Sequence, residues 1–440
     1  MSRFFSAGLA AIAVASLAAC SDAPDAVIGN EPEPPQSVAL SNGAQGEQVM
    51  AGEVLVKVKN GVDVADVARG RGLSVGEHGY REAFVILRGA AGAEHANANA
   101  LKSDSRVEWA EPNYLRRPTV DPKLWAFKNP GGLNMLYSRG GSAGQPISSS
   151  YASTVDADED NIDDSFGAGG AAVVIGSIDT GVDFTHTEFL AGQLIKGQDW
   201  YSNDTDPTDT DGHGTHTTGT MVGRTVGIAG VSGAGLNVKV YVQRVCGQRG
   251  CPTAAIINAI NAAANYGVVA MNLSLGGPSE SQGEKDAIAY ALSKNALVIA
   301  SAGNDGSGTV SCPACDPNAI SVLASNWKDQ KTSYSQYGSG LDIGAPGGEC
   351  YSNTTPEGCI YSSYKGGGYE WLQGTSMAAP QVTGTAGVAA SKNSTLRGNA
   401  AALRSQLLNT ADAVTGLSSY GVKRLNTYRA VTGTTLTSPN

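Results

Sequence analysis

Five near-continuous apolar runs constrain the fold of this chain more than any other feature. They cover residues 171–178, 238–242, 268–275, 296–300 and 319–324. Runs without polar alternation are typical of strands buried on both faces of a parallel sheet. Helical patterns separate several of them, and the clearest spans residues 253–266, with Thr253 as a candidate N-cap and Gly267 as a stop signal. The alternation predicts an α/β sandwich that binds its ligand at the carboxyl ends of the strands.

Three short blocks follow one another in the order Asp, His, Ser. They are Ile178-Asp179-Thr180-Gly181, Asp211-Gly212-His213-Gly214-Thr215-His216 and Gly374-Thr375-Ser376-Met377-Ala378-Ala379-Pro380. Each block places one candidate catalytic side chain among small residues, where the backbone can approach a substrate closely. A serine hydroxyl becomes a nucleophile when an imidazole takes its proton and a carboxylate orients that imidazole. We therefore interpret Ser376 as the nucleophile, His213 as the general base and Asp179 as the orienting carboxylate, in one of the known chain orders.

These blocks resemble those of the subtilisin-like serine proteases, and a fourth block, residues 300–305, resembles the family segment that carries the oxyanion-hole asparagine. The resemblance covers roughly residues 120–432. It implies the α/β fold of that family, a three-layer sandwich with a mainly parallel sheet. It also implies an endopeptidase that acts on polypeptide substrates and needs no organic cofactor. Asn304 would donate its amide to the oxyanion, and a strand formed by Ser274, Leu275 and Gly276 would bind the substrate.

The candidate residues also have structural interpretations. Thr375 or Ser376 could simply cap the helix predicted over residues 377–390, in which Pro380 would lie in the first turn. His213 and His216 share a helical face and could bind a metal, but no third ligand stands at a recognised zinc spacing. We expect His216 to be a packed structural residue and Asp183 to lie beyond the glycine turn, away from the triad.

An acidic segment precedes the general base. It contains Asp199, Asp204, Asp206, Asp209 and Asp211. Crowded carboxylates repel one another unless a cation or solvent neutralises them, and calcium takes six to eight oxygen ligands from such loops. The resemblance implies a structural calcium ion held by Asp199, Asp204, Asp206 and Thr208; the alternative is a solvated acidic loop.

Two features depart from the family pattern. Gln381 stands where the family usually has a histidine, outside the triad, so we expect catalysis to survive this change. The segment between His213 and Gly227 is shorter than in subtilisins, where it carries a second calcium loop. Calcium at that second position is therefore not expected, although Glu188 matches its acidic ligand.

The first 52 residues predict export. Residues 1–19 read as a signal peptide whose apolar stretch is too short to span a membrane. The tetrad Leu17-Ala18-Ala19-Cys20 resembles a bacterial lipobox, in which Cys20 receives a lipid and attaches the chain to a membrane. An ordinary secretion signal is the alternative. Residues 20–52 are rich in Pro, Ser, Asp and Gly and predict a disordered tether. The expected location is the bacterial cell envelope, the exterior after processing, or both.

Residues 53–117 predict a small α+β module ahead of a catalytic domain at 118–440. Strand patterns cover residues 53–60, 84–87 and 106–109, and helical patterns cover residues 62–69 and 91–102. The ending Val-Glu-Trp-Ala-Glu-Pro-Asn-Tyr resembles the end of subtilisin-type propeptides, which implies that the enzyme's own propeptide is a partner. A permanent N-terminal domain is the alternative. A cut near residues 116–118 would separate the enzyme from a lipid on Cys20.

Seven cysteines divide into Cys20 and six others. Six cysteines allow fifteen disulfide pairings. Sequence proximity favours Cys246–Cys251, Cys312–Cys315 and Cys350–Cys359, and export favours disulfides over a redox or zinc centre at Cys312 and Cys315.

The composition argues against nucleic acid as a partner, and two alternatives to a protease remain. The net charge of −10 argues against binding to nucleic acid, which requires basic surfaces. We expect a monomeric protease. The first alternative is a surface lipoprotein whose inactive protease fold serves as a binding module, and intact candidate residues argue against it. The second is a non-peptidase serine hydrolase, whose usual Gly-x-Ser-x-Gly elbow the Ser376 block lacks.

Overall fold

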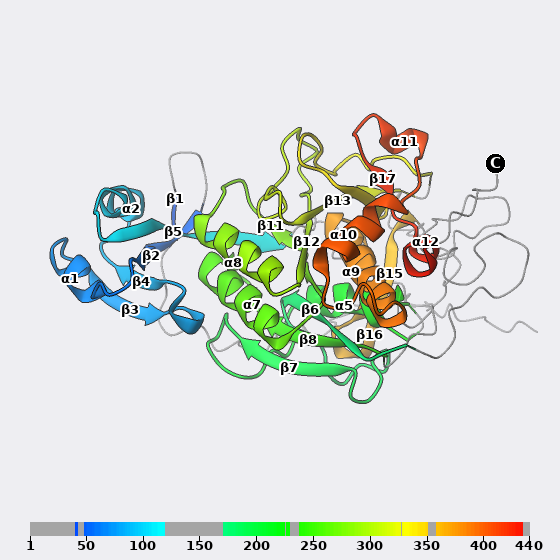
Figure 1. Ribbon diagram of the computed structural model, residues 1–440, viewed down its shortest axis with the longest axis horizontal. Coiled ribbons are helices and arrows are strands. Elements are labelled where there is room, and N and C mark those ends of the chain that lie inside the picture. The colour runs from blue at the N-terminus through cyan, green and yellow to red at the C-terminus, as the bar shows by residue number, and fades with distance from the viewer. Residues whose placement is uncertain are drawn as a thin grey trace, which may run out of the picture.

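A parallel sheet of eight strands forms the centre of the molecule (Figure 1). The computed structural model describes residues 40–42, 48–118, 170–224, 226–228, 237–326, 328–350 and 358–433. The strand order is β17-β14-β13-β12-β10-β6-β8-β7, and all paired neighbours run parallel. The strands are β6 (Val173–Asp179), β7 (Leu194–Asp199), β8 (Val238–Arg244), β10 (Ala270–Leu273), β12 (Leu297–Ser301), β13 (Ile320–Ser325), β14 (Ile343–Pro346) and β17 (Lys423–Arg424). The five apolar runs supply β6, β8, β10, β12 and β13, as predicted.

Helices cover both faces of this sheet, which confirms the three-layer sandwich. One face carries α5 (His213–Val222), α9 (Thr375–Lys392), α10 (Ala400–Asn409) and α12 (Thr427–Thr432). The other face carries α7 (Thr253–Tyr266) and α8 (Gln282–Ser293), which pack side by side (Figure 1). Each face has its own apolar core. The short α11 (Thr415–Ser418) lies near β17, and α9 is buried along almost its whole length, because it packs against the middle strands of the sheet.

The N-terminal module, residues 48–118, is a separate antiparallel sheet with two helices packed on it. Its elements are β2 (Gln48–Val58), α1 (Val64–Arg69), β3 (Ser74–His78), η1 (Tyr80–Glu82), β4 (Val85–Arg88), α2 (Glu94–Lys102) and β5 (Val107–Pro118), and β1 (Leu40–Asn42) pairs with β2. The predicted strands and helices are present. The sequence did not predict β3, because this edge strand is mostly exposed and carries no buried apolar alternation.

Strand β5 leaves the N-terminal module and enters the large domain. It pairs antiparallel with β9 (Cys251–Pro252) through residues 115 and 116, and with β11 (Leu275–Gly276) through residues 117 and 118. The predicted domain boundary at 117/118 therefore falls inside a strand. Before this point, Glu111 accepts hydrogen bonds from Ser281 Oγ and from the backbone N–H groups of Gln282 and Gly283, at the start of α8.

The same module also completes the start of α7, which corrects the predicted N-cap. Thr253 is the first helical residue and Pro252 is the cap, with extended backbone and no capping side chain. A helix leaves its first N–H groups without intrahelical acceptors. Here Asn113 Oδ1, from the N-terminal module, accepts the N–H of Ala254 at 3.1 Å. The predicted stop is confirmed, since Gly267 has a left-handed backbone with φ 90°.

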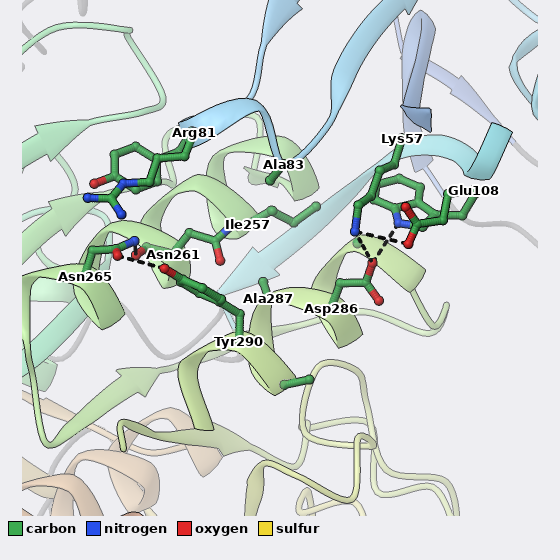
Figure 2. A pocket seen from close by; sticks show the side chains of 14 residues that line it. Lys57, Arg81, Ala83, Glu108, Ile257, Asn261, Asn265, Asp286, Ala287 and Tyr290 are labelled. Carbon is green, nitrogen blue, oxygen red and sulfur yellow. Dashed lines mark hydrogen bonds and ion pairs between the residues drawn. The ribbon is translucent and has the colours of Figure 1, made fainter. Parts of the chain in front are cut away.

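A pocket of about 590 Å³ lies where the N-terminal module meets α7 and α8 (Figure 2). At one end, Lys57 Nζ lies 3.3 Å from Glu108 and 3.7 Å from Asp286. Trp109 Nε1 donates to Asp286 at 2.7 Å. Asp286 belongs to α8 while the other three residues belong to the N-terminal module, so the contacts of Asp286 with Lys57 and Trp109 join the two parts.

Three disulfides join Cys246–Cys251, Cys312–Cys315 and Cys350–Cys359, the pairs that sequence proximity favours. A hairpin of β15 (Ile360–Tyr364) and β16 (Gly368–Leu372), joined by η5 (Lys365–Gly367), packs against α5. In the described part of the chain, no helix is both long and apolar enough to cross a membrane. The predicted signal peptide and Cys20 lie outside the described residues, as does most of the predicted tether.

Candidate active site

Asp179 is the last residue of β6, at the point where the chain order of the sheet reverses. From β6 the chain builds β7 and β8 on one side and then β10 on the other. Ligands of open α/β sheets bind at such switch points, at the carboxyl ends of the strands. The Asp179 carboxylate is 1% exposed. Its Oδ1 accepts the N–H of Thr180 at 2.7 Å and contacts His213 Nδ1 at 2.6 Å, so the predicted carboxylate–imidazole pair is present.

His213 begins α5, and glycines allow it to approach the end of β6. A Cβ on Gly214 would lie 2.1 Å from the carbonyl oxygen of Gly181, so no other residue fits there without a shift. Asp209 shapes the turn before the helix: its carboxylate accepts the N–H groups of Gly212 and Thr215 at 2.8 Å each. The glycines of the first two sequence blocks thus bring the imidazole against the carboxylate.

The charges around His213 favour its protonated form. Burial lowers the pKa of this fully buried imidazole, but the charge and hydrogen bond of Asp179, with the charges of Asp211 and Asp209, raise it above its usual value. His216 behaves differently, because burial and the neighbouring His213 lower its pKa to about 3. Its Nε2 lies 3.2 Å from the carbonyl oxygens of Ile360 and Glu370. His216 is therefore neutral at pH 7 and ties α5 to the hairpin, which confirms the structural interpretation.

Ser376 lies in the first turn of α9, and α9 packs against α5. Its Oγ donates to the carbonyl oxygen of Ser274 at 3.2 Å. In return, Ser274 Oγ donates to the carbonyl oxygen of Ser376 at 2.7 Å, and Asn272 Nδ2 donates to Ser274 Oγ at 2.9 Å. The end of β10 and the residue after it thus hold the start of α9.

Pro380 explains why the Ser376 carbonyl is available for this contact. It is the sixth residue of α9, so the predicted first-turn position is wrong. In an α-helix the N–H of residue 380 would bond to the carbonyl of residue 376, and proline has no N–H. The hydroxyl of Ser274 takes that place. The capping interpretation is also wrong, because the N-cap is Gly374 and Thr375 Oγ1 donates to Asn304 Oδ1.

Asn304 follows β12, and its amide oxygen and amide nitrogen differ in their hydrogen bonding. Its Oδ1 accepts both the N–H and the hydroxyl of Thr375 at 2.9 Å. Its Nδ2 is buried and has no hydrogen-bond partner in the described part of the chain. A buried N–H group without an acceptor is costly. Thr375 therefore fixes the orientation of the Asn304 amide. The Nδ2 donor of that amide is left available to a negatively charged substrate oxygen.

The predicted substrate strand already holds an extended peptide. Leu275 and Gly276 form β11 and pair with residues 118 and 117 of the same chain. Peptides commonly bind by adding a strand to a sheet edge in this way. Ser274, the residue before this pairing, contacts Ser376. The N-terminal module therefore reaches the nucleophile along the edge where the resemblance puts a substrate.

The predicted calcium ligands lie at the end of β7 and in the loop that follows it, but their carboxylates have protein partners. Asp199 pairs with Arg244 at 3.1 Å, and Asp206 pairs with Lys196 at 2.7 Å and accepts the Thr208 hydroxyl. Among the described residues, no three His, Cys, Asp or Glu side chains form a group suited to a metal ion. A calcium ion would have to displace the exposed Lys196, whose ion pair is weak at the surface. Calcium binding here stays a prediction.

Two residues singled out by the sequence lie away from the triad contacts. Asp183 accepts hydrogen bonds from Thr185 and Gly366 rather than from His213. Gln381 is fully buried in α9. Sequence reasoning missed Thr217, which contacts Asp179, and Asn272, which contacts Ser274. For Asn272 the available signal was a polar residue inside an apolar run; Thr217 lies among other polar residues and gave no such signal.

Comparisons with known proteins agree with this geometry. A model of the subtilase family matches residues 170–430. The chain is 33% identical over 389 residues to the thermophilic serine proteinase of Bacillus sp. (strain AK1), with 87% of each chain covered. It is 38% identical to thermitase of Thermoactinomyces vulgaris, over 60% of this chain and 90% of thermitase. The crystal structure of fervidolysin from Fervidobacterium pennivorans matches with a TM-score of 0.66 at 24% identity, over 91% of this chain and 64% of fervidolysin, and supports the fold.

Proposed function

The chain belongs to the subtilase family and is a subtilisin-like serine endopeptidase, and we propose that it cleaves peptide bonds through an acyl-enzyme on Ser376. The observation that carries this proposal is the buried contact of 2.6 Å between Asp179 and His213 at the carboxyl end of β6. That contact fixes the imidazole with Nδ1 toward the carboxylate. It leaves Nε2 as the atom that takes the serine proton.

The reaction uses the four residues in sequence. His213 removes the proton of Ser376 Oγ as that oxygen attacks the substrate carbonyl, and Asp179 stabilises the resulting imidazolium. Asn304 Nδ2 and the N–H of Ser376, at the positive end of α9, bind the oxyanion. His213 then gives its proton to the leaving amine, and water releases the acyl group by the reverse path.

An activated ester tests the acyl-enzyme. Processed enzyme mixed with a p-nitrophenyl ester should release a rapid burst of p-nitrophenol equal to the enzyme concentration, followed by slow turnover. It should also hydrolyse casein. The alternative, an inactive protease fold used for binding, gives neither a burst nor peptides from casein.

We further propose that residues 53–117 are a propeptide that inhibits the enzyme until it is cut from the catalytic domain, residues 118–440. The pairing of β5 with β9 and β11 supports this, because it fills the substrate edge. Pro118 pairs with Leu275, and the residue before Leu275, Ser274, contacts Ser376. We therefore propose that the processed bond is the one between Arg117 and Pro118 or a bond next to it.

Maturation would then release the enzyme from its membrane anchor. Residues 1–19 would be the signal peptide, and Cys20, at the start of the tether 20–52, would carry the lipid into a bacterial cell envelope. We expect palmitate labelling to mark the propeptide fragment only, and N-terminal sequencing to show that the catalytic chain begins at Pro118 or within two residues of it. Label on the processed catalytic chain, or a start well before Pro118, would contradict this order of events.

Removing the Glu111 carboxylate should weaken the hold of the propeptide on the processed enzyme. Glu111→Ala loses three hydrogen bonds at the start of α8. Hydrogen bonds to a charged group contribute about 1.5–3 kcal/mol each, so we expect about a tenfold or greater rise in the fraction of processed enzyme that is free of propeptide. Size-exclusion chromatography of freshly processed protein measures this fraction.

Glu108→Ala is the matched control. Glu108 lies on the same strand, but its side chain is 48% exposed and pairs with Lys57 of its own module. We expect its propeptide to remain bound as in the wild type. Equal dissociation in the two variants would show that the helix contact of Glu111 is unimportant.

A further inference from the structure

We infer that Thr217 is a positioning residue of the triad, whose hydroxyl donates a hydrogen bond to Asp179 Oδ2 and holds that carboxylate toward His213. The inference rests on the proposed function, since it assigns a role within the same site. Thr217 is not one of the four residues to which the sequence assigned a catalytic role.

Helix geometry brings Thr217 to the carboxylate. It follows His213 by four residues in α5, and residues four apart lie on the same helical face. Its Oγ1 lies 3.2 Å from Asp179 Oδ2. Both side chains are buried, with Thr217 at 0% and Asp179 at 1% exposure, so no solvent substitutes for this contact.

The two carboxylate oxygens of Asp179 differ in their donors. Oδ1 receives the N–H of Thr180 and faces His213 Nδ1. For Oδ2, Thr217 Oγ1 is the hydrogen-bond donor that the described residues provide. An ionised carboxylate is an acceptor with about four sites, and leaving a buried oxygen without a donor is costly. The Thr217 hydroxyl therefore satisfies the oxygen that does not face the imidazole.

The hydroxyl has one other acceptor within reach, the carbonyl oxygen of Gly214, also at 3.2 Å. Two arguments favour the carboxylate. Hydrogen bonds to ionised acceptors are roughly twice as strong as those between neutral groups. In addition, the carbonyl of residue 214 receives the N–H of residue 218 in a regular helix, whereas the described part of the chain offers Asp179 Oδ2 no second donor of this kind.

This hydrogen bond moderates the influence of Asp179 on the imidazole. The charged or titratable groups near His213 are Asp179 on β6, Asp209 and Asp211 before α5, and His216 on α5. A donor on Oδ2 withdraws charge from the carboxylate and so weakens its attraction for the imidazolium. Without the donor, the imidazolium is favoured and the pKa of His213 rises. The acidic limb of kcat/KM, which requires neutral His213 in the free enzyme, then moves to higher pH.

Thr217→Val tests this inference, because valine keeps the shape and removes the hydroxyl. We expect the acidic limb of kcat/KM for a peptide substrate to move up by about 0.5 pH unit or more. We also expect kcat to fall by about tenfold, because the carboxylate is less firmly oriented. Thr217→Ser restores the hydroxyl and should restore the wild-type limb. Should the valine variant not fold, Thr217→Ala provides the same comparison.

Thr220→Val is the matched control. Thr220 lies on the same helix, is equally buried, and donates its hydroxyl to the carbonyl of His216 at 3.0 Å, within the helix itself. Loss of the Thr220 hydroxyl should leave the acidic limb of kcat/KM at the same pH as in the wild type. The pH dependence of the rate at which a fluorophosphonate labels each variant gives the same limb without turnover.

The outcomes separate this inference from the proposed function. If the acidic limb of kcat/KM for Thr217→Val lies at the same pH as for the wild type and Thr220→Val, the Thr217 hydroxyl bonds only to Gly214. The inference is then wrong, while the protease assignment stands. If the wild-type protein neither hydrolyses peptides nor reacts with the fluorophosphonate at any pH, the proposed function itself fails.

Discussion

Replacing Ser376 by alanine should lower kcat for peptide hydrolysis by about 10⁶-fold, the loss known for the nucleophile of subtilisin. The change removes the oxygen that attacks the substrate while the backbone contact of residue 376 with Ser274 remains. It should also leave the full-length chain unprocessed, since the same hydroxyl would cut the propeptide. Hydrolysis of a chromogenic peptide and electrophoresis of the purified chain measure the two effects.

Ser321→Ala is the control for this experiment. Ser321 lies on β13, is fully buried, and its hydroxyl has no hydrogen-bond partner among the described residues. We expect this variant to mature and to cleave the peptide at the wild-type rate. Processing or hydrolysis that persists in Ser376→Ala would remove that residue from the nucleophile's role.

Replacing Asp179 by asparagine should lower kcat by about 10⁴-fold, as in other triad enzymes. The amide can present an N–H to His213 Nδ1, which reverses the tautomer and directs a proton at the serine. The Thr180 N–H and the Thr217 hydroxyl would also face an amide rather than an ionised carboxylate. Steady-state kinetics across pH, with circular dichroism to confirm folding, measures this change.

Asp183→Asn provides the comparison for Asp179. Asp183 stands four residues further along the chain, where its carboxylate accepts hydrogen bonds from Thr185 and Gly366. We expect its kcat to remain within about threefold of the wild type, because the Asp183 carboxylate contacts Thr185 and Gly366 rather than His213 and an amide oxygen can still accept from them. A larger loss in Asp183→Asn than in Asp179→Asn would exchange the roles of the two carboxylates.

The main strands and the carboxylate–imidazole pair could be predicted from sequence because each has a strong local signal. Strands buried on both faces need uninterrupted apolar runs, and Asp179 ends one of them. The disulfides were favoured for a related reason, since cysteines three to nine residues apart need little chain to meet.

Other features depend on contacts between distant segments and left no local signal. The N-terminus of α7 is completed by Asn113, about 140 residues earlier, so Thr253 looked like the cap. The exposed edge strand β3 carries no apolar alternation. The partnership of Ser274 with the Ser376 carbonyl follows from Pro380 only once the start of α9 is known.

The assignment of the nucleophile is most directly tested by locating the adduct of a fluorophosphonate on the processed enzyme by peptide mass spectrometry. The reagent forms a stable bond only with a serine whose proton is taken by an adjacent base. We expect one adduct per chain, on Ser376, and none in Asp179→Asn under the same exposure. An adduct on another serine, or a folded and processed enzyme that takes up no reagent, would contradict the proposed triad.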